Sequence, residues 1–145
     1  MRPALDDLRS GARLRVLPQI LQELEKAIDA PALFVQMMHA TWEKVEPDVS
    51  EPLMERFEAI GPAAFLNDLR ACDRFDIIDR LSEITTPTLA VCGTDDVMTP
   101  PKYSHFLADG IAGARVEIIQ GGTHMVFLEK PDQVNRSIAA FLDAL

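Results

Sequence analysis

Apolar residues recur at helical spacing from the start of the organised part of the chain. One helical face lies between Pro18 and Pro31 and is formed by Ile20, Leu21, Leu24, Ala27 and Ile28. A second helix is expected to begin near Pro31, because a proline at the first helical position has no N–H to leave unpaired. Its broad apolar stripe includes Leu33, Phe34, Met37, Met38, Trp42 and Val45.

Helical patterns continue up to about residue 85. Pro47, Asp48 and Ser50 indicate a loop, and a short helix follows that Gly61 and Pro62 end. Phe65, Leu66 and Leu69 mark a further helix, and apolar residues at wider spacing run from Asp73 to Ile84. The sequence therefore predicts a series of helices with no convincing strand in this region.

After Pro87 the pattern changes to alternating strands and helices. Two β-rich apolar runs, Thr88 to Cys92 and Val116 to Ile119, are each followed by a helical face. This order predicts a right-handed βαβ crossover and two parallel strands. Both strands look continuously apolar, as expected when helices cover both faces of a sheet. The fold class is therefore α/β, although two parallel strands need further strands or helix cover to be stable.

Composition narrows the classes of protein. The 145 residues carry 23 acidic and 14 basic side chains without a basic cluster, so nucleic acid is not an expected partner. No stretch of about 18 apolar residues suggests a membrane span, and no signal-type segment begins the chain, so we expect a soluble cytoplasmic protein without a membrane partner. Cys72 and Cys92 lack metal-type spacing and are interpreted as reduced structural residues.

Candidate chemistry gathers where the two predicted strands end. Asp95 and Asp96 follow the first strand, and His124 follows the second. Ligands of open α/β sheets bind outside the carboxyl ends of the strands, and an aspartate facing His124 would orient the imidazole as a general base. The alternative is that the aspartates only cap a turn and His124 starts a helix. Two acids and one distant histidine match no metal-ligand spacing.

The stripe of the second helix allows two interpretations. Phe34, Met38 and Trp42 are interpreted first as core residues and, as a weaker alternative, as a surface that contacts an apolar substrate. His39 is expected to be a buried or half-exposed structural residue rather than a catalytic one.

At these residues the sequence resembles the C-terminal part of the α/β-hydrolase superfamily. PTLAVCGTDDVMTP is similar to its penultimate strand and acid loop, and residues 113–145 are similar to its last strand, histidine loop and closing helix. The family pattern G-x-x-D-x-x-x-P fits Gly93, Asp96 and Pro100, which implies that Asp96 rather than Asp95 is the acid. The G-G-x-H turn followed by Glu129 and Pro131 implies that His124 is the base. The resemblance implies a helical cap at residues 1–85 and a strand–helix–strand–helix portion of the core at 86–145.

The sequence departs from the family at the nucleophile. None of the 145 residues forms a G-x-S-x-G, G-x-C-x-G or G-x-D-x-G motif. The resemblance therefore implies a partial fold that is inactive alone, within a family that hydrolyses small molecules at ester, thioester, lactone or carbon–carbon bonds. No cofactor is implied. The alternative is a non-enzymatic interaction module that forms a homo-oligomer, because an unpaired strand edge favours strand pairing or helix exchange with another copy.

Overall fold

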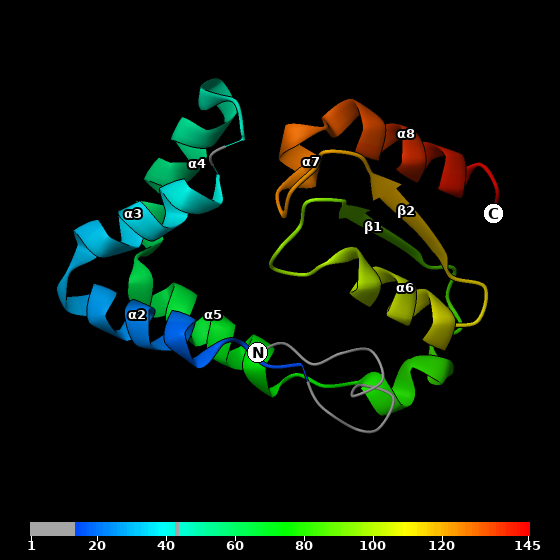
Figure 1. Cartoon of the computed structure of the whole chain (residues 1–145), viewed down its shortest axis with the longest axis horizontal. Helices are drawn as coiled ribbons and strands as arrows, with labels where there is room; N and C mark the ends of the chain where they lie inside the picture. The colour runs from blue at the N-terminus through cyan, green and yellow to red at the C-terminus, as the bar shows by residue number, and fades with distance from the viewer. Residues whose placement is uncertain (1–13, 43) are drawn as a thin grey trace. The chain divides into compact units, whose positions relative to one another are not determined.

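The computed structural model describes residues 14–42 and 44–145, and the chain divides into two compact units, Met1–Asp76 and Ile77–Leu145. The first unit is helical and the second contains the strands (Figure 1). The boundary between the units thus falls before residue 85. The assignment of a cap to residues 1–85 and of a core portion to 86–145 stays a prediction.

Helices α2 (Pro18–Asp29), α3 (Pro31–Thr41), α4 (Pro47–Ile60) and α5 (Pro62–Arg74) build the first unit. Each begins with a proline in its first turn, where the missing N–H has no cost. Helix α2 packs against α5 and α3, and α4 packs against α3 and α5. The predicted helices over residues 18–31 and after Pro62 are therefore confirmed.

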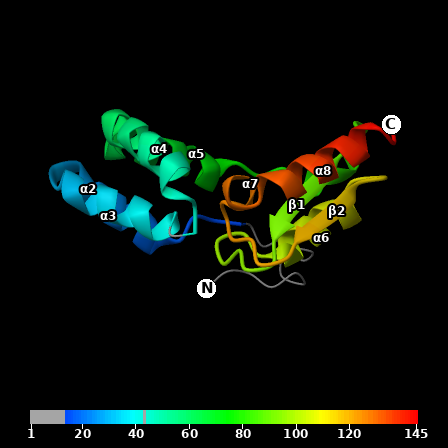
Figure 2. The same ribbon diagram turned by 90° about the horizontal axis from the view of Figure 1, so that it is seen from above.

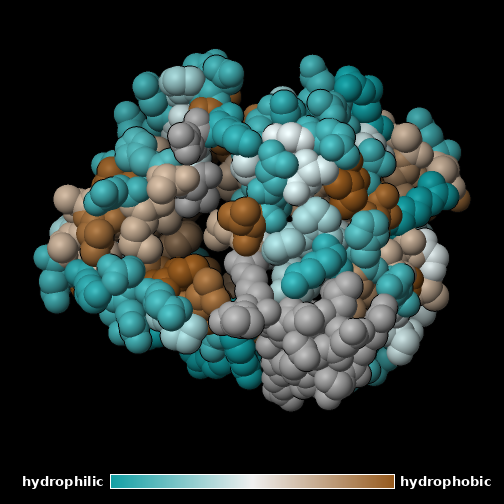
Figure 3. All heavy atoms as spheres, in the orientation of Figure 1, coloured by the Kyte–Doolittle hydropathy of each residue, from teal (hydrophilic) through white to brown (hydrophobic). Residues whose placement is uncertain are grey.

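The core of the helical unit is apolar and rich in aromatic rings. Leu24 and Ala27 of α2 have no exposed surface, and Met54 and Leu66 are also buried. Phe57 and Phe65 lie 6.0 Å apart between ring centroids in an edge-on arrangement. Figure 3 shows apolar patches among hydrophilic residues over the visible face of these helices.

Two local predictions for this unit are wrong. The loop expected at Pro47, Asp48 and Ser50 is the first turn of α4, where Pro47 suits the helix start and the Asp48 carboxylate favours the positive end of the helix dipole. Helix α3 ends at Thr41, so Trp42 and Val45 do not belong to the helix as predicted. Both are buried, but they lie in the segment that follows the helix. The apolar character of these two residues therefore reflects burial and not a helical period.

The second unit begins with a 3₁₀-helix, η1 (Ile78–Glu83), where the sequence suggested a helical pattern. Strand β1 (Leu89–Gly93), helix α6 (Pro101–Gly110), strand β2 (Arg115–Ile119), helix α7 (Val126–Glu129) and helix α8 (Pro131–Leu142) follow. The strands pair in parallel, with Leu89 opposite Arg115 and Gly93 opposite Ile119. Helix α6 connects the two parallel strands, as expected for the predicted βαβ crossover, and α6 and α8 lie on opposite sides of the strands in Figures 1 and 2.

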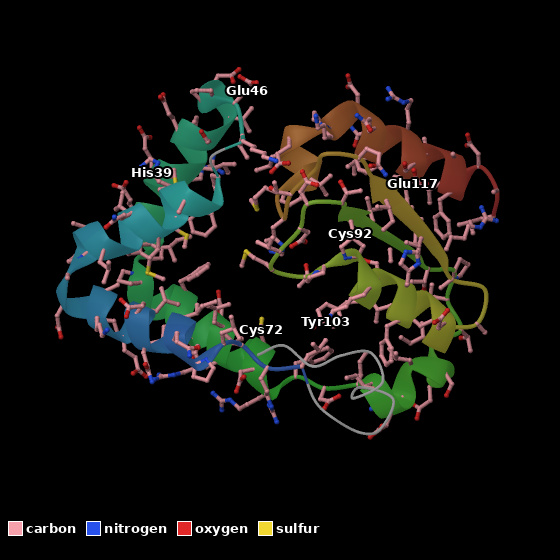
Figure 4. The ribbon with its side chains drawn as sticks, viewed as in Figure 1. His39, Glu46, Cys72, Cys92, Tyr103 and Glu117 are labelled. Carbon is pink, nitrogen blue, oxygen red and sulfur yellow. The ribbon has the colours of Figure 1, made fainter. Side chains whose placement is uncertain are left out.

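The prediction that both strands are covered on both faces is wrong for β2. Arg115 and Glu117 are exposed while Val116 and Ile118 are partly buried, so β2 alternates between a polar and an apolar face. Figure 4 labels Glu117 on this strand. An open groove of about 330 Å³ runs beside it and is lined by Leu89, Arg115, Val116, Glu117, Arg136, Ser137, Ala140 and Phe141. Helix α8 therefore leaves part of the sheet uncovered within this unit.

In the part of the chain that the structure describes, no helix combines the length and the apolar character required to cross a bilayer.

Candidate active site

Strand β1 delivers Asp96 to a buried position just beyond its carboxyl end. The chain turns after Gly93, and the Asp96 N–H donates to the Gly93 carbonyl at 3.3 Å. The Asp96 side chain then accepts hydrogen bonds from the next turn, since its Oδ1 binds the N–H groups of Met98 and Thr99 at 2.8 and 2.7 Å. Its Oδ2 accepts the Thr99 hydroxyl at 2.8 Å. Side-chain and backbone bonds therefore fix this carboxylate on both oxygens.

Strand β2 delivers His124 to the same edge of the sheet. The loop after Ile119 turns at Gly121, whose φ of 68° belongs to the left-handed region that glycine favours. His124 stands immediately before α7, for which Met125 is the N-cap residue. The Glu129 carboxylate at the end of α7 accepts both the N–H of Thr123, at 2.7 Å, and its hydroxyl. This two-oxygen contact closes the loop that carries the histidine.

Hydrogen bonds also join the two strand-end loops to each other. The Thr94 N–H donates to the Ile119 carbonyl at 3.0 Å, and the Gly121 N–H donates to the Thr94 hydroxyl at 2.8 Å. The Asp95 N–H donates to the Gly122 carbonyl at 2.9 Å. The relative position of Asp96 and His124 is therefore set by backbone contacts as well as by their own side chains.

The two side chains meet directly. His124 Nδ1 lies 3.0 Å from Asp96 Oδ2, and the side chains are 37% and 5% exposed respectively. For this contact to be a hydrogen bond to a carboxylate, Nδ1 must carry the proton, which leaves the lone pair on Nε2. The arrangement matches that of an acid and a base in a hydrolytic triad, in which Nε2 accepts a proton from the nucleophile.

The surroundings of Asp96 favour its ionised form. Burial, the largest effect, raises the pKa of this carboxyl. The hydrogen bonds from the Thr99 backbone, from His124 and from the Thr99 hydroxyl, with the attraction of the imidazolium, outweigh burial and hold the pKa below its ordinary value. An ionised aspartate is the form that can stabilise a protonated histidine beside it.

The structure separates the two candidate aspartates. Asp96 faces His124, as the family spacing implies, whereas Asp95 is exposed and its Oδ1 accepts the Thr94 hydroxyl at 3.0 Å. Asp96 also binds the N–H groups of its own turn, so the alternative of a turn-capping residue describes part of its contacts. The catalytic role of Asp96 and His124 stays a prediction.

Cys92 lies in β1, one residue before the strand ends (Figure 4). It is buried, and its Sγ lies 3.4 Å from the carbonyl oxygens of both Gly93 and Thr99, to either of which its single S–H can donate. Burial is the main cause that raises the pKa of this thiol, and the charge of Asp96 adds to it. A thiol held in its neutral form is a poor nucleophile, so Cys92 acts as a core residue. Cys72, by contrast, is an exposed free thiol on α5.

The candidate substrate-contacting residues belong to the helical unit. Phe34 is 1% exposed and Met38 and Trp42 are each 6% exposed. Phe34 packs against Phe65 at 5.7 Å between ring centroids, which is the behaviour of a core residue. Substrate contact by Phe34, Met38 and Trp42 stays a prediction. His39 is exposed on α3, so the expectation that it is buried or half-exposed is wrong (Figure 4).

Sequence reasoning missed two supporting contacts of this site. The first is Thr99, which lies in the turn after Asp96; an aspartate commonly binds the backbone two residues on, here Met98, and the Thr99 contacts extend that turn. The second is the contact of Thr123 with Glu129, although Glu129 is part of the family pattern after the histidine.

In the described residues, no group of three or more His, Cys, Asp or Glu side chains could hold a metal ion.

Comparison with known proteins places this geometry in a family. The sequence matches the alpha/beta hydrolase fold family over residues 31–131. The "Putative carbamate hydrolase RutD" of Rhizobium rhizogenes is 40% identical over 84 residues, which are 58% of this chain and 32% of that protein. A proline iminopeptidase of Lactobacillus acidophilus is 36% identical over 70 residues, which are 48% of this chain and 24% of that protein.

Solved structures agree with the sequence matches. A thermophilic esterase is 32% identical with a TM-score of 0.71, and the match covers 92% of this chain and 53% of the esterase. The enol-lactonase from Burkholderia xenovorans shares the fold, with a TM-score of 0.76 at 21% identity over 89% of this chain and 52% of the lactonase. The chain thus spans about a third of the RutD protein and about half of these solved structures. The family match, the shared fold and the paired strand-end loops together show that the chain belongs to the α/β-hydrolase family.

Proposed function

We propose that this chain supplies the acid and the base of an α/β-hydrolase reaction on a small molecule. The observation that carries the proposal is the 3.0 Å contact of Asp96 Oδ2 with His124 Nδ1 at the carboxyl ends of the parallel strands. His124 Nε2 takes the proton of a nucleophile as that group attacks a carbonyl carbon. It then returns the proton to the leaving group, while ionised Asp96 stabilises the imidazolium between the two steps.

The nucleophile of this reaction comes from outside the 145 residues. The strained strand-to-helix turn that exposes a nucleophile in this family needs glycines on both sides of the residue, and no such motif is present in the sequence. The buried neutral thiol of Cys92 is no substitute. By itself the chain therefore has no measurable hydrolase activity, because the acid and the base have no group to activate.

The substrate is a carbonyl compound with a leaving group that accepts a proton. RutD is named as a carbamate hydrolase, and the solved structure that is 32% identical is an esterase. Carbamates, esters, thioesters and lactones share a carbonyl carbon open to nucleophilic attack, so the same pair could serve each of them. The reaction needs only side chains and water and no cofactor.

A substrate screen tests the proposal in two steps. The 145-residue chain should leave ester, thioester and carbamate substrates unchanged. A chimera that joins it to the half of the thermophilic esterase that the chain does not match, where we expect the nucleophile, should turn over ester. His124→Ala and Asp96→Ala should each abolish this turnover. Turnover by the chain alone that His124→Ala removes would disprove the inactivity, and a folded active chimera insensitive to His124→Ala would disprove the role of the base.

A second candidate function is a non-enzymatic interaction module. The described residues contain a sheet of only two strands, so each strand is paired along one edge. A small sheet of this kind needs further strands or cover, and an open edge favours pairing with another chain. The expected assembly is a homo-oligomer that pairs β1 across the interface or exchanges helices. Light scattering that shows a clean monomer at tens of micromolar would count against it.

A further inference from the structure

The Asp96 carboxylate is surrounded by donors. Its Oδ1 accepts the N–H groups of Met98 and Thr99, and its Oδ2 accepts the Thr99 hydroxyl and His124 Nδ1. An ionised carboxylate offers about four acceptor sites on its two oxygens. Each of these sites has a protein donor, and the buried side-chain atoms of the described residues include none without a hydrogen-bond partner.

We propose that Thr99 is a positioning residue for the Asp96–His124 pair, because its hydroxyl binds the same carboxylate oxygen as the histidine and holds the carboxylate in the pairing orientation. This inference rests on the proposed function, in which Asp96 and His124 act as acid and base. Thr99 touches no reacting atom and acts only through these two side chains.

Of the two hydrogen bonds from Thr99 to Asp96, only the one from the hydroxyl depends on the type of residue at position 99. Any residue except proline at position 99 could donate the backbone N–H bond at 2.7 Å. The same holds for the backbone N–H bond from position 98. The hydroxyl bond at 2.8 Å requires threonine or serine. The loop could therefore fold with another residue at position 99, but Oδ2 would then be held by His124 alone.

The hydroxyl also lies beside the imidazole. Thr99 Oγ1 is 3.3 Å from His124 Nδ1. Because the hydroxyl proton points to Asp96 Oδ2, the oxygen lone pairs of Thr99 are left for Nδ1–H, which can share its proton between Oδ2 and Oγ1. The imidazole is therefore oriented by two acceptors instead of one, and Nε2 keeps a defined direction.

A carboxylate whose acceptor sites are all filled by hydrogen-bond donors also keeps the proton on the histidine. When His124 is protonated during the reaction, an under-bonded Asp96 could take that proton, whereas a carboxylate with four donors is stabilised in its ionised form. Two titratable groups interact electrostatically with Asp96: His124 lowers its pKa, and the Cys92 thiol has its own pKa raised by the charge of Asp96. Asp95 adjoins it in sequence but is exposed.

Thr99→Val and Thr99→Ser test the proposal in the 145-residue chain. Valine keeps the volume without the hydroxyl, and serine keeps the hydroxyl without the methyl group. NMR titration of the ¹³C-labelled Asp96 carboxyl should show a higher pKa in Thr99→Val, and Thr99→Ser should retain the low pKa. Thr88→Val is the control, because the Thr88 hydroxyl donates to the nearby Thr86 carbonyl, at 3.0 Å, and lies outside the hydrogen bonds of Asp96 given above.

Denaturant unfolding at several pH values gives a second readout that a purely structural role would not move. At neutral pH the unfolding equilibrium constant of Thr99→Val should rise about tenfold, as expected for the loss of a hydrogen bond to a charged group. The difference from Thr99→Ser should shrink as the pH falls through the titration of Asp96, since the lost bond favours only the ionised form. A structural role would produce the same difference at every pH.

Three results would overturn the proposal: an unchanged Asp96 pKa in Thr99→Val, an equal rise in Thr88→Val, or a pH-independent difference in stability between Thr99→Val and Thr99→Ser. If Thr99→Val does not fold, Thr99→Ala, which also lacks the hydroxyl, replaces it in both measurements. These measurements report only on the carboxylate, whereas the proposed function is judged by turnover of the chimera. The failure of one is therefore distinguishable from the failure of the other.

Discussion

The backbones of Gly93 and Gly122 pack so closely that a Cβ atom on Gly93 would lie 2.1 Å from the Gly122 carbonyl oxygen. Gly93 ends β1 and precedes Asp96, and Gly122 lies in the loop that carries His124. The absence of a side chain at Gly93 thus lets the two strand-end loops approach. The distance between the acid and the base depends on this contact.

The first prediction concerns Gly93→Ala. The new methyl group would meet backbone atoms, which cannot move aside as a flexible side chain can, so the variant should lose about 2 kcal/mol or more of stability. Denaturant unfolding measures the loss. Gly113→Ala is the control, because Gly113 has a φ of 75° but a methyl group there would meet nothing within 4 Å, and it should lose only about 1 kcal/mol from backbone strain. Equal losses in the two variants would contradict the close approach.

The second prediction concerns acid pH. Because the folded-state pKa of Asp96 lies below its ordinary value of 3.8, its ionised form stabilises the fold above that value, and this contribution is lost as the pH falls through the folded-state pKa. Asp96→Asn should lower stability at neutral pH and flatten this part of the pH profile. It should also move the His124 proton toward Nε2, since an amide can donate to Nδ1.

Unfolding at a series of pH values and ¹⁵N chemical shifts of the imidazole check this prediction. Asp95→Asn is the matched control, because His124 Nδ1 contacts Asp96 Oδ2 while the exposed Asp95 accepts the Thr94 hydroxyl, so the acid-side loss should persist in that variant. If the pH profile flattens in Asp95→Asn and not in Asp96→Asn, the acid-side loss of stability comes from Asp95, and the prediction is wrong.

The third prediction concerns the loop that carries His124. Glu129→Gln replaces one acceptor oxygen by a donor, so it should cost about 1 to 2 kcal/mol, as expected for hydrogen bonds to a charged acceptor. Thr123→Val removes only the hydroxyl contact and should cost less. A double-mutant cycle should give a coupling of about 0.5 kcal/mol or more between the two positions.

The control for Glu129 is Glu83→Gln. Glu83 pairs with Arg80 at 2.8 Å on the exposed surface of η1, and such pairs contribute only about 0.3–0.5 kcal/mol. If Glu129→Gln costs no more than Glu83→Gln, or if the cycle shows no coupling with Thr123, the carboxylate does not hold the histidine loop.

Local residue preferences predict the elements of the second unit well. The apolar run that ends at Gly93 and the run from Val116 to Ile119 form β1 and β2 in the expected parallel pairing. The polar residues Arg115 and Glu117 of β2 are visible in the sequence, but a run this short does not separate an alternating strand from an apolar one. Helix α7 is not predicted, because a helix of four residues has too few positions to show a period.

The contact between Asp96 and His124 is predictable from the sequence, but the hydrogen bonds that support it are not. Spacing after Gly93 selects Asp96, but the sequence contains no information on which donors fill its oxygens. Thr99 supplies two of them from a turn, and a turn is set by backbone geometry that apolar periodicity does not report. The start of α4 at Pro47 escapes prediction for a related reason, since a proline followed by an aspartate suits a loop as well as a first helical turn.

The fourth prediction concerns the core of the helical unit. Phe34 is almost fully buried, and its ring packs against Phe65, so Phe34→Ala should lose about 3 to 5 kcal/mol of stability through the lost apolar contact and the cavity left behind. The exposed Phe75, at 67%, is the control, and Phe75→Ala should change stability by no more than about 0.5 kcal/mol.

Unfolding measurements on both variants also decide between the two interpretations of this residue. A core phenylalanine is costly to remove whether or not a substrate is present. If Phe34→Ala were as stable as Phe75→Ala, the ring would be dispensable for folding, and its apolar surface would be free for a substrate instead. Met38 and Trp42, each 6% exposed, are buried core residues as well, so alanine substitutions at these positions allow the same comparison.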